Sequence, residues 1–235
     1  MKNIVIGIEG LVGSGKTSIC RDLLNIIPNS IVFHGGNLYR AIIYTLIQEN
    51  KELFKNMQTL KENIADIDIK KLMDSLNVEV KIEDRQTVVY VDGKKIEEEK
   101  IQSKEASMAV SVAVGSADNT NLFIFLRNLI NEFKEKYNVI LSGRAINTIY
   151  PNVDYHFLIT ASLDERVKRK ASQYGENANL DDLREHIIKR DELQEKAGFY
   201  DIKENTIVVD VTDCKNIQES TEKVCEYIEE LKSII

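Results

Sequence analysis

The sequence predicts an α/β fold in which a five-stranded parallel sheet is flanked by helices. Five short apolar segments alternate along the chain with longer segments whose apolar residues recur at helical spacing. Such alternation is typical of a parallel sheet that is covered on both faces. A glycine-rich loop directly after the first apolar segment supports the same fold, because ligands of these sheets bind at the carboxyl ends of the strands.

The glycine-rich loop spans residues 10–17 and reads Gly-Leu-Val-Gly-Ser-Gly-Lys-Thr. It matches every fixed position of the phosphate-loop pattern G-x-x-x-x-G-K-S/T, with an apolar strand at 4–8 before it and a helix over 17–24 after it. The glycines let successive N–H groups converge on phosphate oxygens, and the helix directs the positive end of its dipole at them. A glycine-rich turn before an ordinary helix is the alternative.

We therefore expect the loop to bind a polyphosphate. Lys16 would reach the β- and γ-phosphates, and the hydroxyl of Thr17 is placed to bind Mg²⁺. The residues predicted to bind the nucleotide are Gly10, Gly13, Ser14, Gly15, Lys16, Thr17 and Ser18.

A second strand is predicted at 31–33, followed by His34, a flexible glycine pair at 35–36 and a helix over 38–48. This helix would carry Tyr39 and Arg40 in its first turn. Because the helix dipole does not favour a cation at that end, we expect Arg40 to bind a ligand. A solvated surface arginine is the alternative.

Residues 52–118 interrupt the alternation of strands and helices, so we expect them to form an inserted subdomain in a core made of residues 1–51 and 119–235. The segment 51–77 has helical periodicity with many charges, 78–82 and 87–91 read as a hairpin, and 103–114 reads as a helix.

The remaining core follows in order after a helix at 122–133. Strands are predicted at 139–141, 155–160 and 206–210, and helices at 163–173, 180–196 and 217–231. The first of these strands ends in Ser142, Gly143 and Arg144, at the expected ligand edge. The helix at 163–173 carries the densest cluster of positive charge, for which a ligand-binding role and a solvated helix face are the two interpretations. That cluster consists of Arg166, Lys168, Arg169 and Lys170.

Composition limits the partners. The chain has 235 residues with 38 acidic and 31 basic side chains, and its net charge of −7 argues against nucleic acid as the main partner. It contains no apolar run of membrane-spanning length and no room for a signal peptide before the first strand, so we expect a cytoplasmic protein, and a monomer. The three scattered cysteines, Cys20, Cys214 and Cys225, are expected to be packing residues.

At this point the residues resemble the bacterial cytidylate kinases, which are nucleoside monophosphate kinases of the P-loop superfamily. The similar segments occur in order along nearly the whole chain. They are Ile8-Glu9-Gly10 with the phosphate loop, Leu38-Tyr39-Arg40-Ala41, Ile101 to Ala113, Ser142-Gly143-Arg144, Tyr150-Pro151, Thr160-Ala161-Ser162, Glu165-Arg166 and Arg190-Asp191.

The resemblance implies a nucleoside-monophosphate-kinase fold with a monophosphate-binding subdomain at 52–118 and a helical lid at about 163–196. It implies transfer of the γ-phosphoryl group of ATP, with Mg²⁺, to a small nucleotide such as CMP or dCMP. By the same resemblance, catalytic roles fall on Lys16, Arg40, Arg144, Arg166, Arg169 and Arg190, and substrate binding on His34, Asn37, Tyr39, Arg40, Ser107 and Arg144.

The chain departs from the family pattern at positions that, by resemblance, hold the base and the ribose. His34 and Ala145 stand where the family has carboxylates, and Ser142 replaces a glutamate. A separate departure, before the phosphate loop, is Glu9 in place of the usual aspartate. Further departures are Thr120, Gln194 and Ala197, with Lys196 as a candidate substitute for a lost arginine.

Residues expected near phosphates are kept, which indicates phosphoryl transfer with a remodelled base pocket. The alternatives are a kinase for a different small acceptor and a degenerate ATP-binding regulatory protein without turnover.

Overall fold

The computed structural model describes residues 2–49, 59, 62–63, 71, 75–101, 120–174, 179–196, 198–200 and 202–231. The chain forms two compact units, one made of residues 1–32 and 133–235 and the other of residues 33–132. The predicted helix over 103–114 and most of the segment 51–77 lie outside the described residues. The division into a core and an insertion at 52–118 stays a prediction.

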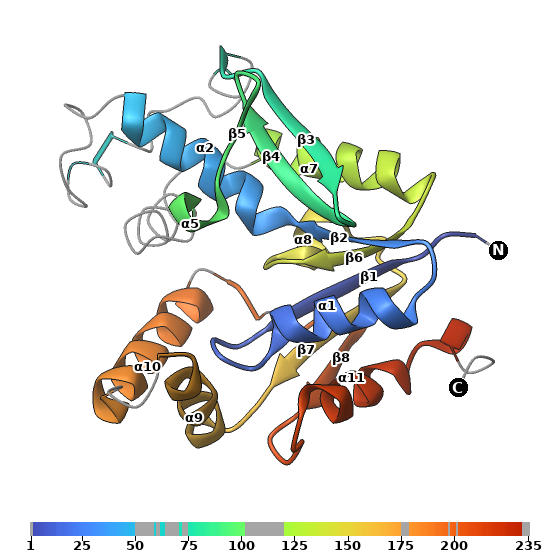
Figure 1. The fold of residues 1–235 in the computed structure, drawn as a ribbon, viewed down its shortest axis with the longest axis vertical. Coiled ribbons are helices and arrows are strands. Elements are labelled where there is room, and N and C mark those ends of the chain that lie inside the picture. The colour runs from blue at the N-terminus through green and yellow to red at the C-terminus, as the bar shows by residue number, and fades with distance from the viewer. Residues whose placement is uncertain are drawn as a thin grey trace. The chain divides into compact units, whose positions relative to one another are not determined.

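The first unit is built on a sheet whose strand order is β2-β6-β1-β7-β8 (Figure 1). β1 pairs in parallel with both β6 and β7, and β7 pairs in parallel with β8. These are the strands that the sequence predicts, so the largely parallel α/β fold is confirmed. Their bounds are Val5–Gly10 for β1, Ser30–His34 for β2, Asn138–Ser142 for β6, Tyr155–Thr160 for β7 and Thr206–Asp210 for β8.

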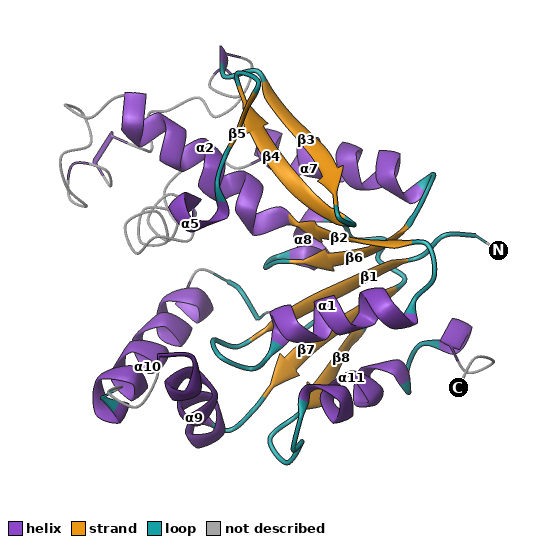
Figure 2. Cartoon of the chain, in the orientation of Figure 1, coloured by secondary structure: helices purple, strands orange, loops and turns teal. Residues whose placement is uncertain are grey.

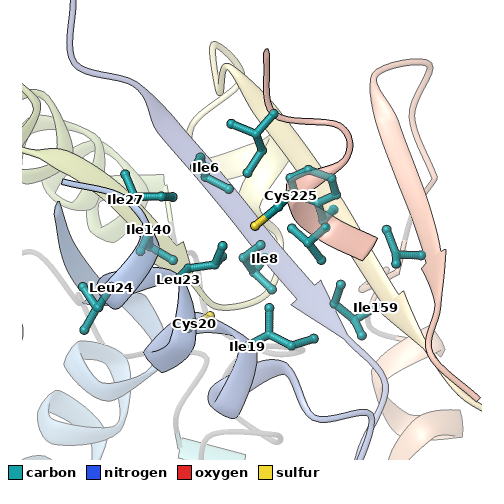
Figure 3. Packing of buried hydrophobic residues seen from close by; sticks show 14 of the residues in the cluster. Ile6, Ile8, Ile19, Cys20, Leu23, Leu24, Ile27, Ile140, Ile159 and Cys225 are labelled. Carbon is teal, nitrogen blue, oxygen red and sulfur yellow. The ribbon is translucent and has the colours of Figure 1, made fainter. Parts of the chain in front are cut away.

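The core of this unit lies between the sheet and two helices, α1 (Lys16–Ile26) and α11 (Ile217–Cys225). Figure 3 shows Ile6 and Ile8 of β1 facing Ile19 and Leu23 of α1, and all four are fully buried. Alternation along the strand and a spacing of four along the helix bring these residues to one interface. Each buried side chain of this size stabilises the fold by about 1.5–3 kcal/mol.

The cysteine prediction is confirmed, since all three are buried free thiols within this cluster. Burial raises the pKa of the Cys20 thiol, although the positive charge of Lys16 and a hydrogen bond with Ser142 oppose the shift. A thiol with a raised pKa is a poor nucleophile, as suits a packing residue.

Four more helices belong wholly or partly to the first unit. They are the end of α7 (Thr120–Lys134), the short α8 (Ile146–Ile149), α9 (Leu163–Tyr174) and α10 (Leu180–Lys196). The helices α9 and α10 pack against each other as a pair, as Figure 2 shows. Their charged segments agree with the predicted helices at 163–173 and 180–196. No helix of the described segments is both long and apolar enough to span a bilayer.

The second unit contains the antiparallel hairpin that the sequence predicts. β3 (Val78–Glu83) pairs with β4 (Gln86–Val91), and the turn residues Asp84 and Arg85 have φ values of 46° and 63°. Positive φ at both turn positions is the geometry that matches the twist of a two-residue hairpin. The described part of this unit also includes α2 (Gly35–Glu49), β5 (Lys94–Lys95), α5 (Glu98–Ile101) and most of α7.

The two helix boundaries that differ most from the prediction are the start of α2 and the end of α11. α2 begins at Gly35, so the glycine pair is helical and Tyr39 and Arg40 follow the first turn. Burial of Leu38 and Tyr39 offsets the weak helix propensity of glycine. α11 ends at Cys225, and residues 229–231 form a separate 3₁₀ turn. The buried positions there keep a helical spacing while the hydrogen bonds tighten to i→i+3, which periodicity does not distinguish.

Candidate active site

The phosphate loop connects β1 to α1 and is shaped by glycines. Gly13 has a φ of 82°, and a Cβ atom there would lie 3.2 Å from the carbonyl oxygen of Arg166. Gly15 has a φ of 98° and forms the N-cap of α1. Both backbone conformations are costly for other residues, so the loop needs glycine at these positions.

The loop is also fastened to the helix pair α9 and α10. Val12 is buried in a small apolar cluster with Val167 of α9 and Ile187 of α10. The backbone N–H of Val12 donates to Oδ1 of Asp191 at 3.2 Å. An apolar contact and a hydrogen bond thus attach one loop residue to both helices.

Arg166 lies at the centre of this attachment and is only 7% exposed. Its Nε donates to the carbonyl of Ala161 at 3.0 Å, and its Nη1 donates to the carbonyl of Val12 at 3.2 Å and to Oδ2 of Asp191. Asp191 therefore accepts from the loop and from Arg166 at once. A buried charge that is paired and fully hydrogen-bonded holds its neighbours firmly.

Arg169 holds the other side of the loop. Its Nη1 donates to the carbonyl of Ser14 at 3.1 Å, its Nη2 to the carbonyl of Val211 at 2.8 Å, and its Nε to Glu165 at 3.0 Å. The resemblance implies that Arg166 or Arg169 acts near phosphate. In the structure Arg166 donates to the carbonyl of Val12 and Arg169 to the carbonyl of Ser14, both in the phosphate loop, and their contact with phosphate stays a prediction.

Lys16, the first residue of α1, contacts the last residue of β6. The register pairs Ile8 with Ser142, and the ammonium of Lys16 donates to the Ser142 hydroxyl at 3.0 Å. Where the resemblance expects a glutamate, Lys16 thus has a neutral partner. A hydroxyl competes less with phosphate for the lysine than a carboxylate would.

Glu9 lies in a buried polar network behind the loop. Its Oε1 accepts from the backbone N–H of Ile146 at 2.7 Å and lies 3.2 Å from Nε2 of His156. Nδ1 of His156 lies 2.9 Å from both the Asn147 amide and the Thr206 hydroxyl. Glu9 thus holds the start of α8.

Glu9 thereby supports the turn that carries Arg144. The next residue, Ala145, has a φ of 54°, a conformation that costs an ordinary residue about 1–3 kcal/mol and persists only where the surroundings fix it. The hydrogen bond from Ile146 to the buried Glu9 is one such restraint.

Arg144 itself lies beside the segment that follows α10. Its guanidinium carbon is 5.9 Å from the ring centroid of Phe199. Burial raises the pKa of the Tyr200 hydroxyl to about 12, while the charge of Arg144 and a hydrogen bond with it oppose the shift. Arg190 acts on the same hydroxyl and also adds to the effect of burial in lowering the pKa of Lys170. Arg144 and Arg190 are therefore both close to Tyr200.

Four of the predicted substrate residues belong to the second unit. The His34 backbone N–H donates to the Thr87 hydroxyl at 2.9 Å, and its ring Nε2 lies 3.1 Å from the Gln86 side chain. Nη1 of Arg40 lies 3.4 Å from Oδ1 of Asn37. Tyr39 is buried. His34 thus joins β2 to the hairpin, and its predicted contact with substrate stays a prediction.

Two sequence-predicted positions, Ser107 and Ala197, lie outside the described residues. Sequence reasoning missed the roles of Phe199 and Tyr200 and the attachment of Asp191 to the loop. An available signal was the Gly-Phe-Tyr run that ends α10, because a glycine just past a helix often turns the chain back upon it.

Comparison with known proteins identifies the family. The family model described as cytidylate kinase matches residues 6–230. The chain belongs to the cytidylate kinase family. A cytidylate kinase of Caldicellulosiruptor bescii is 30% identical, with 96% of each chain covered, and one of Halalkalibacterium halodurans is 25% identical, with 98% of this chain and 99% of the relative covered. A cytidylate kinase of Clostridium botulinum is 28% identical over 97% of this chain and 99% of its own.

The family resemblance inferred from the sequence is thus confirmed over the full chain. As a member of the cytidylate kinase family, the chain is a divergent nucleoside monophosphate kinase with the phosphate loop near its start. The structure adds that two departures from the family pattern lie near Arg144, one directly and one through another residue. Ala145 follows Arg144 in the chain, and the buried Gln194 accepts a hydrogen bond from the Tyr200 hydroxyl.

Proposed function

We propose that this chain transfers the γ-phosphoryl group of ATP to a nucleoside monophosphate, as a cytidylate kinase with a remodelled base pocket. The proposal rests on the observation that the carboxyl ends of β1 and β6 lie side by side in the first unit. Lys16 of the phosphate loop reaches Ser142 at 3.0 Å, and Arg144 follows two residues later. A cation for the donor and a cation for the acceptor thus come from neighbouring strands.

Transfer between two phosphates requires little covalent help from the protein. A monophosphate acceptor is already a nucleophile at neutral pH, so catalysis consists of alignment and neutralisation of charge. In this proposal the loop amides and Lys16 bind the β- and γ-phosphates of ATP. Arg144 binds the acceptor phosphate through paired N–H donors, and Arg190 adds positive charge to the transferring group. The role of Arg40 toward the acceptor stays the expectation from the family resemblance.

Arg166 and Arg169 take a different part in this proposal. Because their N–H groups donate to Val12, Ser14 and other carbonyls, they act as positioning residues for the phosphate loop. The apolar cluster around Val12 keeps α9 and α10 against the loop. A helix pair held in this way excludes water from the γ-phosphate, which limits hydrolysis of ATP.

The residues present fit Mg²⁺ bound mainly through the nucleotide. Mg²⁺ prefers oxygen ligands and usually binds through substrate phosphates, water and one or two protein groups. Thr17, exposed at the start of α1, offers one hydroxyl oxygen. Among the described residues no group of three or more His, Cys, Asp or Glu side chains could hold a metal by itself. When bound, the ion neutralises phosphate charge, and Thr17 would hold it beside Lys16.

The acceptor is proposed to be CMP or dCMP. At His34, Ala145 and Gln194, nevertheless, this chain lacks the polar groups that the family pattern has. A site that loses hydrogen-bonding partners for one base loses discrimination for that base. We therefore also propose that this chain prefers cytosine less strongly than the family pattern implies. The cytoplasmic location and the monomeric state stay predictions.

The test is release of ADP from Mg·ATP with CMP, dCMP, UMP, GMP, AMP and dTMP as separate acceptors. Turnover with CMP, dCMP or another pyrimidine monophosphate supports the proposal. Turnover with a different small acceptor alone would replace it with a small-molecule kinase, and ATP binding without turnover on any acceptor would leave a regulatory nucleotide-binding protein.

A further inference from the structure

The segment Gly198–Tyr200 turns back onto the end of α10 and brings two aromatic side chains to Arg144. Gly198 and Tyr200 have φ values of 74° and 70°, and the backbone N–H of Phe199 donates to the carbonyl of Gln194 at 2.9 Å. A positive φ is strained for tyrosine and persists only where the surroundings hold it. The Tyr200 hydroxyl supplies one such restraint, because it donates to the side chain of the buried Gln194.

The two aromatic residues act on different parts of the arginine. The ring of Phe199 lies 5.9 Å from the guanidinium carbon of Arg144, within the range of a cation–π contact. Tyr200 lies near enough for the charge of Arg144 to oppose the burial that raises the pKa of its hydroxyl. The ring of Phe199, with this hydroxyl nearby, restricts the orientation of the planar guanidinium.

One N–H group of Arg144 has no acceptor among the described residues. Nε of Arg144 is buried, and none of the described residues accepts a hydrogen bond from it. A buried donor without an acceptor lowers the stability of the fold, and an anion that accepted from it would recover this loss. Nε and the neighbouring Nη form the edge of guanidinium that binds an oxyanion through two parallel hydrogen bonds.

We propose that Phe199 and Tyr200 are positioning residues that present the Nε edge of Arg144 to the phosphate of the acceptor nucleotide. The inference rests on the proposed phosphoryl transfer, because that function identifies the oxyanion. It adds residues of this chain that the family pattern does not assign. Gln194 takes part by holding Tyr200, which gives the loss of the family aspartate at this position a structural consequence.

The first experiment separates positioning from packing by steady-state kinetics of the full chain. Phe199→Leu removes the ring and is expected to raise the KM for the acceptor about tenfold, the size of a partly desolvated cation–π contact, with the KM for ATP unchanged. Tyr200→Phe is expected to raise it about threefold. Phe199→Trp keeps a cation-binding ring and is expected to restore the wild-type KM.

Tyr227→Leu is the matched control, because it removes another partly exposed ring of the same unit, one that contacts Phe157 and no arginine among the described residues. Its acceptor KM should not change. If Phe199→Leu and Tyr227→Leu give the same acceptor KM, the positioning role is wrong. A packing role alone would change both substrates' KM values together and would not be rescued by Phe199→Trp.

A second experiment measures the binding of CMP and of inorganic phosphate by fluorescence, without turnover. The chain contains no tryptophan, so Phe199→Trp introduces a unique fluorophore beside Arg144. Titration with CMP, and separately with inorganic phosphate, in the absence of ATP should change its fluorescence. The response should disappear when Arg144→Ala is added.

The outcomes distinguish the two proposals. If a monophosphate is phosphorylated normally but the fluorescence response does not depend on Arg144, the positioning inference is overturned and phosphoryl transfer stands. If no acceptor in the panel is phosphorylated while the Arg144-dependent response to phosphate persists, the positioning of Arg144 stands and the proposed function is overturned.

Discussion

The phosphate loop and the turn at Ser142–Ala145 lie at the ends of two adjacent strands, but their polar groups are satisfied differently. In the loop region, Arg166, Arg169 and Asp191 hold backbone groups of the loop. At the turn, Arg144 stands against two aromatic residues and retains a buried Nε without an acceptor among the described residues.

The difference separates two ways of preparing a site for an anion. In the loop region the protein's own side chains hold several backbone groups, and the buried Ser14 hydroxyl has no partner among the described residues. At the turn it is a cationic donor, Nε of Arg144, that is buried without an acceptor among them. Departures from the family pattern occur in both regions: Ser142 accepts from Lys16 of the loop, Ala145 lies in the turn, and Gln194 accepts from the Tyr200 hydroxyl.

The largest effect is expected from Lys16→Ala. Removing the ammonium takes away the cation that neutralises the β- and γ-phosphates, and we expect kcat to fall at least about 100-fold. The measurement is ADP release from Mg·ATP with the best acceptor, alongside thermal unfolding to show that the fold is intact. Lys168→Ala is the control, since this lysine is 81% exposed. Equal activity of the two variants would contradict the role of Lys16.

Arg166→Ala should mainly lower stability. It leaves the Asp191 carboxylate and the Val12 carbonyl without their shared partner, and breaking a buried pair costs about 3–5 kcal/mol. The free energy of unfolding, measured with urea, checks this value. Arg184→Ala is the matched control, because its ion pair with Asp164 joins side chains that are 42% and 82% exposed. Exposed pairs contribute less than about 1 kcal/mol. A similar loss in both variants would show that Arg166 does not fasten the loop.

Glu9→Asp tests the link between the loop strand and the turn. This change restores the usual family residue but shortens the side chain, so the carboxylate should no longer reach both Ile146 and His156. We expect a loss of about 1–3 kcal/mol in the free energy of unfolding, because the buried N–H of Ile146 loses its acceptor. The acceptor KM should rise with it, while the KM for ATP should change less. An acceptor KM equal to that of the wild type would contradict the claim that Glu9 supports the turn that carries Arg144.

The smallest effect is expected from the titration of Tyr200. Burial raises its folded-state pKa to about 12, above the usual value of 10.0, so between these values the folded chain retains a proton that the unfolded chain has lost. Its contribution to stability is therefore complete below pH 10 and is lost as the pH rises toward 12. Between pH 10 and pH 12 the free energy of unfolding should therefore decline less in Tyr200→Phe than in Tyr227→Phe. Identical declines in the two variants would contradict the shifted pKa.

Much of this organisation was predictable from the sequence because it depends on local pattern. The phosphate loop, the strands around β1, the hairpin turn at Asp84 and Arg85 and the paired helices α9 and α10 follow from glycine spacing and apolar periodicity. The roles of Arg166 and Glu9 were not predictable in this way. Each depends on a partner far along the chain, Asp191 for the arginine and Ile146 for the glutamate.

The sequence by itself determined the fold class, the family and the presence of a phosphate loop with cations near it. Only the tertiary structure decided which cations hold the protein together and which one keeps a donor for a ligand. A local pattern specifies backbone conformation, since that depends on neighbouring residues. The partner of a charged side chain depends on which distant segments the fold brings close to it, and the ring that the fold brings to Arg144 is that of Phe199.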